Sequence, residues 1–138
     1  MLNTAYQIVK KIENYGCSAY LVGGAPRDIL LGKEPKDVDI STNAPIYLLE
    51  FLFTCYDIGK SKDFGIVTAK VNGYDFEIAQ FRKETGYSDG RRPDQVETVS
   101  SFYEDISRRD FTINAMGINS DEKIVDYFGG KDDLVQLA

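Results

Sequence analysis

Two aspartates separated by one residue are the part of this sequence best suited to chemistry. Asp37 and Asp39 alternate with Val38 and Ile40, and a strand over residues 37–41 would turn both carboxylates to one face and both aliphatic side chains to the other. Close carboxylates repel unless a cation or proton intervenes, and magnesium prefers oxygen ligands that it shares with phosphates and water. The pair therefore predicts a two-metal site for phosphoryl transfer, although a solvated strand face would have the same pattern.

A third carboxylate is expected from a later pair of strands. Residues 64–81 form two strand patterns joined at Asn72-Gly73, which is the strongest short hairpin signal. In the second strand Asp75 and Glu77 point to the same face. Either side chain could complete a three-carboxylate set, and the spacing alone does not choose between them.

A pair of glycines predicts a phosphate-binding turn. Gly23 and Gly24 end a short apolar strand, and Pro26 fits the first turn of the helix that follows. Glycine lets the backbone approach a ligand closely, the helix start directs N–H groups to the same place, and Arg27 can add a bidentate phosphate contact. The alternative is an ordinary strand–turn–helix corner.

A polar segment at residues 83–95 is predicted to be a loop. It contains Arg91 and Arg92 between a glycine and a proline, an arrangement that would let the loop close over a triphosphate. A solvated turn is the alternative interpretation.

The segment RRDFTINAM, residues 108–116, contains a further polar cluster. Asp110 follows Arg108 and Arg109 directly, and Asn114 lies four residues later on the same face of a predicted helix. These groups can bind phosphate or a ribose hydroxyl, and an exposed basic pair on a helix is the alternative.

The elements that must position these residues indicate an α+β fold with a mixed or antiparallel sheet flanked by helices. Helices are predicted for residues 2–14, 26–31 and 43–54, for a segment that begins at Ser101, and for a segment that begins at residue 132. The helix from Ser101 would include Phe102 and Met116 on one face. Strands are predicted for residues 19–22, 37–41, 64–71, 74–81, 117–119 and 123–127.

Composition and charge restrict the function further. The 138 residues contain no histidine and two cysteines far apart, so zinc chemistry is not expected. A net charge of −6 argues against a self-sufficient nucleic-acid binder. No membrane span or signal peptide is indicated, and we expect a cytoplasmic protein with reduced thiols.

Read in order, LVGGAPRDILLGKEPKDVDIST and the later RRDFTINAM resemble the head domain of class II tRNA nucleotidyltransferases. This family includes CCA-adding enzymes, their CC- and A-adding relatives and bacterial poly(A) polymerases, with a polymerase beta-like nucleotidyltransferase fold. The similarity covers about residues 18–134, and DGRRP and DYFGGKDDL also match. Pro26 departs from the family, which usually has an aliphatic residue there.

The resemblance implies roles for the residues above. Asp37, Asp39 and Glu77 match the catalytic, metal-binding carboxylates, which favours Glu77 over Asp75. The residues that match nucleotide-binding or triphosphate-binding positions are Gly23, Gly24, Arg27, Arg91, Arg92, Arg108, Arg109, Asp110 and Asn114, with Arg109 favoured for a phosphate contact.

The resemblance also implies the reaction and its partners. It implies transfer of a nucleotide from CTP or ATP to an RNA 3′-hydroxyl with two Mg²⁺ ions (or Mn²⁺ in their place), most simply the addition of CCA, CC or A to tRNA. A poly(A) polymerase head is the first alternative, and a metal- and nucleotide-binding head that needs a separate neck, body and tail chain is the second. We expect residues 1–130 to form the head and residues 131–138 to begin a truncated or missing neck helix, with weak tRNA binding by this chain alone.

Overall fold

The fold is built on a seven-stranded sheet whose strands run in the order β3-β4-β5-β2-β1-β8-β9. The computed structural model describes residues 1–56, 65–85, 95–98, 102 and 116–126. Within these ranges every strand pairing is antiparallel except the parallel pair β2 and β5. The expected α+β class, with a mixed sheet and flanking helices, is confirmed. The elements are α1 (Leu2–Glu13), β1 (Ala19–Val22), α2 (Gly24–Leu30), β2 (Asp39–Thr42), α3 (Ile46–Leu52), β3 (Thr54–Tyr56), β4 (Ile66–Val71), β5 (Tyr74–Gln80), β6 (Arg82–Thr85), β7 (Gln95–Thr98), β8 (Met116–Ile118) and β9 (Ile124–Asp126).

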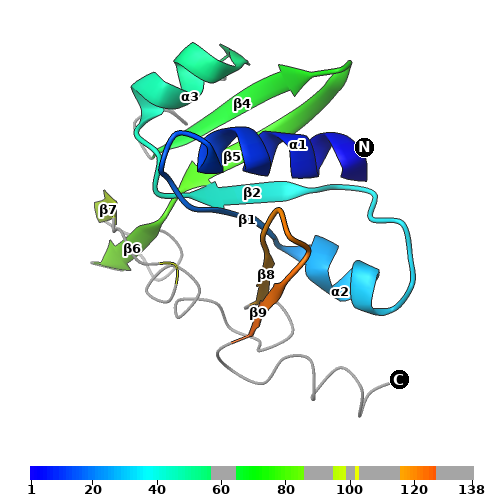
Figure 1. Cartoon of the computed structure of the whole chain (residues 1–138). Helices are drawn as coiled ribbons and strands as arrows, with labels where there is room; N and C mark the ends of the chain where they lie inside the picture. Colours follow the sequence, from blue (N-terminus) through cyan, green and yellow to red (C-terminus); the bar gives the residue numbers. More distant parts are fainter. Residues whose placement is uncertain (57–64, 86–94, 99–101, 103–115, 127–138) are drawn as a thin grey trace.

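Helix α1 lies across the sheet as its periodicity predicts (Figure 1). Its buried side chains recur at helical spacing, with Ala5, Ile8, Val9 and Ile12 each at most 1% exposed. They join the main hydrophobic cluster, which also contains residues of α3 and of the central strands. This cluster covers one face of the sheet, and the exposed Asp39 of β2 lies on the other face.

The hairpin of β4 and β5 turns at Asn72-Gly73, as predicted. Both residues have positive φ, 52° and 82°, which is the conformation of a tight two-residue hairpin turn. Phe76 and Ile78 of β5 are fully buried in the main cluster. By alternation, Glu77 lies on the opposite face of the strand.

A second, smaller cluster lies on that opposite face. Val22, Phe81 and Phe102 are buried in it, with Tyr20 packed against them. The rings of Tyr20 and Phe102 stack with centroids 4.1 Å apart. A Cβ on Gly117 would lie only 2.5 Å from the Phe102 ring, so the close approach of this ring requires glycine in β8.

Several predicted elements differ from the structure. Strand β3 follows α3 directly and was not expected. Strand β6 covers the first residues of the segment predicted to be a loop, and β7 begins at its last residue. Met116 begins β8 instead of continuing a helix from Phe102. The helix predicted from residue 132 lies outside the described residues. Within the described part of the chain, no helix is long and apolar enough to cross a membrane.

Candidate active site

The turn between β1 and α2 brings the backbone against a carboxylate. Gly23 has φ 74° and ψ −134° and precedes the first residue of α2. A Cβ at Gly23 would lie 3.3 Å from Oδ2 of Asp39. Glycine is therefore needed here for its backbone conformation and for the space beside Asp39.

The guanidinium of Arg27 folds back over the start of its own helix. A Cβ at Gly24 would meet an Arg27 nitrogen at 3.0 Å, and Arg27 Nε pairs with Asp28 Oδ1 at 3.4 Å. Pro26 is buried in the first turn of α2, so the helix start tolerates this departure from the family. Gly23, Gly24 and Arg27 are thus brought together as predicted.

Asp37 and Asp39 line one cleft, but not through the predicted strand alternation. Strand β2 begins at Asp39, so Asp37 precedes the strand by two residues. Val38 and Ile40 are 4% and 1% exposed, and their burial holds the segment while both carboxylates face outward. The two acids share a cleft of about 480 Å³.

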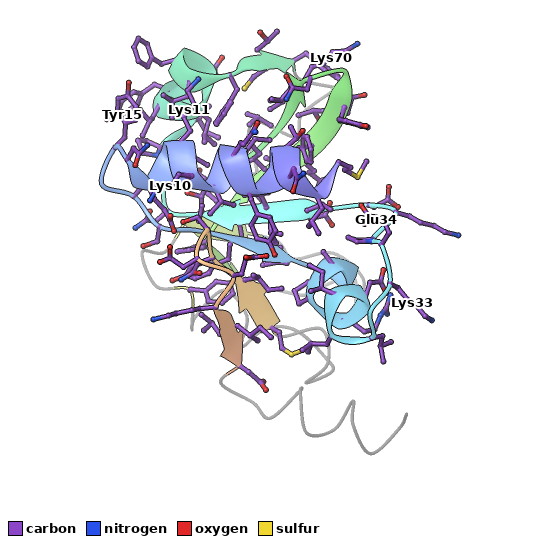
Figure 2. The ribbon with its side chains drawn as sticks, turned by 45° about the vertical axis from the view of Figure 1, so that its right-hand side comes forward. Lys10, Lys11, Tyr15, Lys33, Glu34 and Lys70 are labelled. Carbon is purple, nitrogen blue, oxygen red and sulfur yellow. The ribbon has the colours of Figure 1, made fainter. Side chains whose placement is uncertain are left out.

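This cleft, the Asp37–Asp39 cleft, has walls from two further segments. Helix α2 contributes Gly24, Arg27 and Asp28, and the loop between α2 and β2 contributes Lys33, Glu34 and Lys36. Figure 2 shows Lys33 and Glu34 beside α2, well separated from Lys10 and Lys11 on α1. None of these loop residues belongs to the site that the sequence predicted. Their position between two motifs that converge on one site is the signal that would have identified them.

The third predicted carboxylate lies on the strand next to Asp39. In the parallel pair of β2 and β5, Glu77 is the register partner of Asp39, so both side chains are on the face opposite α1. Asp75 instead accepts a hydrogen bond from the Tyr56 hydroxyl; this bond, with some desolvation and the carboxylate's charge, raises the pKa of Tyr56. The register therefore places Glu77, and not Asp75, beside Asp39.

The carboxylates do not form a closed set of ligands in this conformation. Among the residues that the structure describes, no three Asp, Glu or Cys side chains lie close enough together to hold a metal ion, and Glu77 is absent from the described lining of the cleft. Two acids in an open cleft still fit magnesium, because this ion is usually held by one or two protein carboxylates together with substrate phosphates and water. The third-ligand role of Glu77 stays a prediction.

The remaining predicted site residues lie outside the described residues. They are Arg91, Arg92, Arg108, Arg109, Asp110 and Asn114. Their roles therefore stay predictions.

The sequence is similar to bacterial CCA-adding enzymes. It is 43% identical over 131 residues to the CCA-adding enzyme of Bacillus pumilus (strain SAFR-032), an alignment that covers 94% of this chain and 32% of that protein. It is 46% identical over 136 residues to the CCA-adding enzyme of Leuconostoc citreum (strain KM20), covering 96% of this chain and 32% of the relative. The chain thus spans about a third of the length of these relatives.

The fold is similar to solved structures of the same kind. The Bacillus stearothermophilus CCA-adding enzyme in complex with CTP superposes with a TM-score of 0.83 at 34% identity, over 96% of this chain and 31% of that one. A tRNA nucleotidyltransferase complexed with a primer tRNA and an incoming ATP analog gives a TM-score of 0.69 at 34% identity, over 93% and 36%. Residues 19–137 match the Poly A polymerase head domain family. With its converging glycine turn and aspartate pair, this chain belongs to that family.

Proposed function

We propose that this chain is the catalytic head of an RNA nucleotidyltransferase that adds nucleotides from CTP and ATP to the 3′ end of tRNA. The observation that carries the proposal is the meeting of the glycine turn, Arg27 and the pair Asp37 and Asp39 at one cleft. The similar CCA-adding enzymes, one of them solved with CTP, support this choice of reaction.

In the proposed reaction, the oxygen of the RNA 3′-hydroxyl forms a bond to the α-phosphorus of the nucleotide. The bond from that phosphorus to the oxygen bridging to the β-phosphate breaks, its electron pair leaves with pyrophosphate, and the hydroxyl proton passes to solvent. Two Mg²⁺ ions, or Mn²⁺ in their place, would activate the hydroxyl and neutralise the leaving group.

The protein's part is to hold and orient the reactants. Asp37 and Asp39 would hold the metal ions, Glu77 would complete the set from the neighbouring strand, and Arg27 would contact a phosphate at the glycine turn. No group of the chain needs to form a covalent bond, because positioning and electrostatic stabilisation supply most of the catalysis in phosphoryl transfer.

Incorporation of labelled CTP and ATP into tRNA that lacks its 3′-terminal CCA tests this function. We expect Asp39→Ala to abolish incorporation, since the remaining carboxylate of the pair cannot position the metal ions alone. Lys10→Ala, an exposed substitution on α1, serves as the control and should retain activity. Normal incorporation by Asp39→Ala would exclude the proposed site, and tails much longer than three nucleotides would identify a poly(A) polymerase instead.

The net charge supports a second form of the proposal. A charge of −6 predicts weak tRNA binding by this chain alone at physiological salt. A separate chain would then supply the RNA-binding parts, in the cytoplasm, where the two free thiols stay reduced. Calorimetry showing that the chain binds Mg–ATP, with incorporation only after such a chain is added, would support this form.

A further inference from the structure

Two lysines of the Asp37–Asp39 cleft have no role in the proposed chemistry so far. Lys33 and Lys36 come from the loop between α2 and β2 and line the same cleft as the aspartates. Both residues are exposed. The chain has more acidic than basic residues, 22 against 16. Two lysines beside a pair of carboxylates therefore require an explanation in terms of function.

The loop that carries these lysines is anchored along its length. Its first turn closes at Gly32, where φ is 73°, and the amide of Lys33 donates a hydrogen bond to the Asp28 carbonyl at 2.8 Å. Pro35 is buried between the two lysines, and Val38 is buried just after them. The backbone at both lysines is therefore fixed, and only their flexible side chains must be ordered by a ligand.

The charges of the cleft are partly matched within the protein. Arg27 is paired with Asp28, whereas neither lysine has a salt-bridge partner within the described residues. Besides the aspartate pair, the described carboxylates of the lining are Asp28, which is paired with Arg27, and Glu34. Once metal ions compensate Asp37 and Asp39, the lysines leave an excess of positive charge on this wall, which suits an anionic ligand.

We propose that Lys33 and Lys36 bind the polyphosphate chain of the incoming nucleotide in the Asp37–Asp39 cleft and hold the pyrophosphate as it leaves. This inference rests on the proposed function and adds two phosphate-binding residues to it. Lysine suits this task because its ammonium group is a compact charge that can follow the phosphate from substrate to product. The ligand class is a polyphosphate, and the nucleotide's base and sugar take no part in this contact.

Isothermal titration calorimetry of the whole 138-residue chain with the magnesium complex of inorganic tripolyphosphate tests the inference directly. We expect Lys33→Ala and Lys36→Ala each to weaken binding about twofold to fivefold, the range for exposed charge pairs. If the two effects add, the double variant should bind about fourfold to twenty-fivefold more weakly. The loss of affinity caused by the alanine substitutions should be smaller for pyrophosphate and absent for orthophosphate. It should also diminish as the salt concentration increases. Such dependence on phosphate number is not expected from a general loss of structure.

Two variants serve as controls. Lys10→Ala removes an exposed lysine of α1 that lies far from the cleft (Figure 2), and it should bind tripolyphosphate like the unaltered chain. The double variant Lys33→Arg with Lys36→Arg keeps both charges and should restore most of the affinity.

Three results would overturn the inference. The first is that the unaltered chain does not bind Mg–tripolyphosphate. The second is that the double alanine variant binds it as tightly as the unaltered chain. The third is that the double alanine variant loses affinity for a 3′-terminal tRNA oligonucleotide while its affinity for tripolyphosphate is unchanged. The last result would assign the lysines to RNA phosphates instead. Lysine-dependent tripolyphosphate binding together with no incorporation of CTP or ATP would sustain the inference and reject the proposed reaction, so the two failures are distinguishable.

Discussion

Replacing Gly23 with alanine separates the structural role of the glycine turn from its role at the site. The backbone there has φ 74° and ψ −134°, close to a region that only glycine adopts readily, so alanine should cost about 1–3 kcal/mol. For a domain of this size each kcal/mol corresponds to roughly 3–5 °C in Tm. We therefore expect Gly23→Ala to melt several degrees below the unaltered chain.

The second effect of this substitution concerns the carboxylate of Asp39. The new Cβ would lie 3.3 Å from Oδ2, so the carboxylate must move by a few tenths of an ångström. Disturbing the groups that orient a metal ligand commonly lowers metal affinity by about tenfold or more. Calorimetric titration with Mg–ATP should therefore show about tenfold weaker binding.

A glycine of the β4–β5 turn provides the matched control. Gly73 also has positive φ, 82°, but a Cβ there would meet no atom within 4 Å. Gly73→Ala should therefore lose stability through backbone strain and keep its affinity for Mg–ATP. Equal Mg–ATP binding by Gly23→Ala and Gly73→Ala would refute the argument that Gly23 positions Asp39, and an unchanged Tm for Gly23→Ala would refute the backbone argument.

Two further predictions concern parts of the fold away from the cleft. Gly117→Ala would place a Cβ 2.5 Å from the Phe102 ring and should lower the free energy of unfolding by about 1–3 kcal/mol through overpacking. In urea denaturation, the double variant Gly117→Ala with Phe102→Ala should lose less stability than the sum of the two single variants. Burial raises the pKa of Tyr6, with a smaller contribution from the charge of Glu122, so the folded state favours the neutral phenol. This contribution to stability is fully present below the ordinary tyrosine pKa of about 10 and is lost as the pH rises through the folded value. Between about pH 9 and pH 11, the free energy of unfolding of Tyr6→Phe should therefore fall less than that of the unaltered chain. Equal falls would contradict the raised pKa of Tyr6.

The elements that sequence reasoning found are those whose signals are local. Helix α1 has its apolar side chains at helical spacing, and the β4–β5 hairpin has its turn in a single dipeptide, Asn72-Gly73. Strand β3 has only three residues and exists because it pairs with β4, with Cys55 opposite Ala69. Such a strand depends on a partner that is distant in sequence, so its own composition does not predict it.

The same distinction applies to Met116. Its apolar character fitted the helical face predicted from Phe102 onward, but the residue is 1% exposed within a sheet strand. An apolar residue near a suspected helix end fits either element, and the pairing of β8 with β1 and β9 decides between them.

The aspartate pair shows how a correct grouping can arise from a different cause. Alternation along a strand was expected to place Asp37 and Asp39 together, yet only Asp39 belongs to β2. Val38 is buried between them, and Gly23 leaves the space in which the Asp39 carboxylate lies. The geometry of the pair therefore depends on the turn after β1 as much as on the DVD segment itself, which is why two motifs separated along the chain form one site. It also explains why the loop with Lys33 and Lys36 reaches the cleft. This loop connects the helix that follows the glycine turn to the strand that begins at Asp39, so its charged residues line the same cleft as both motifs.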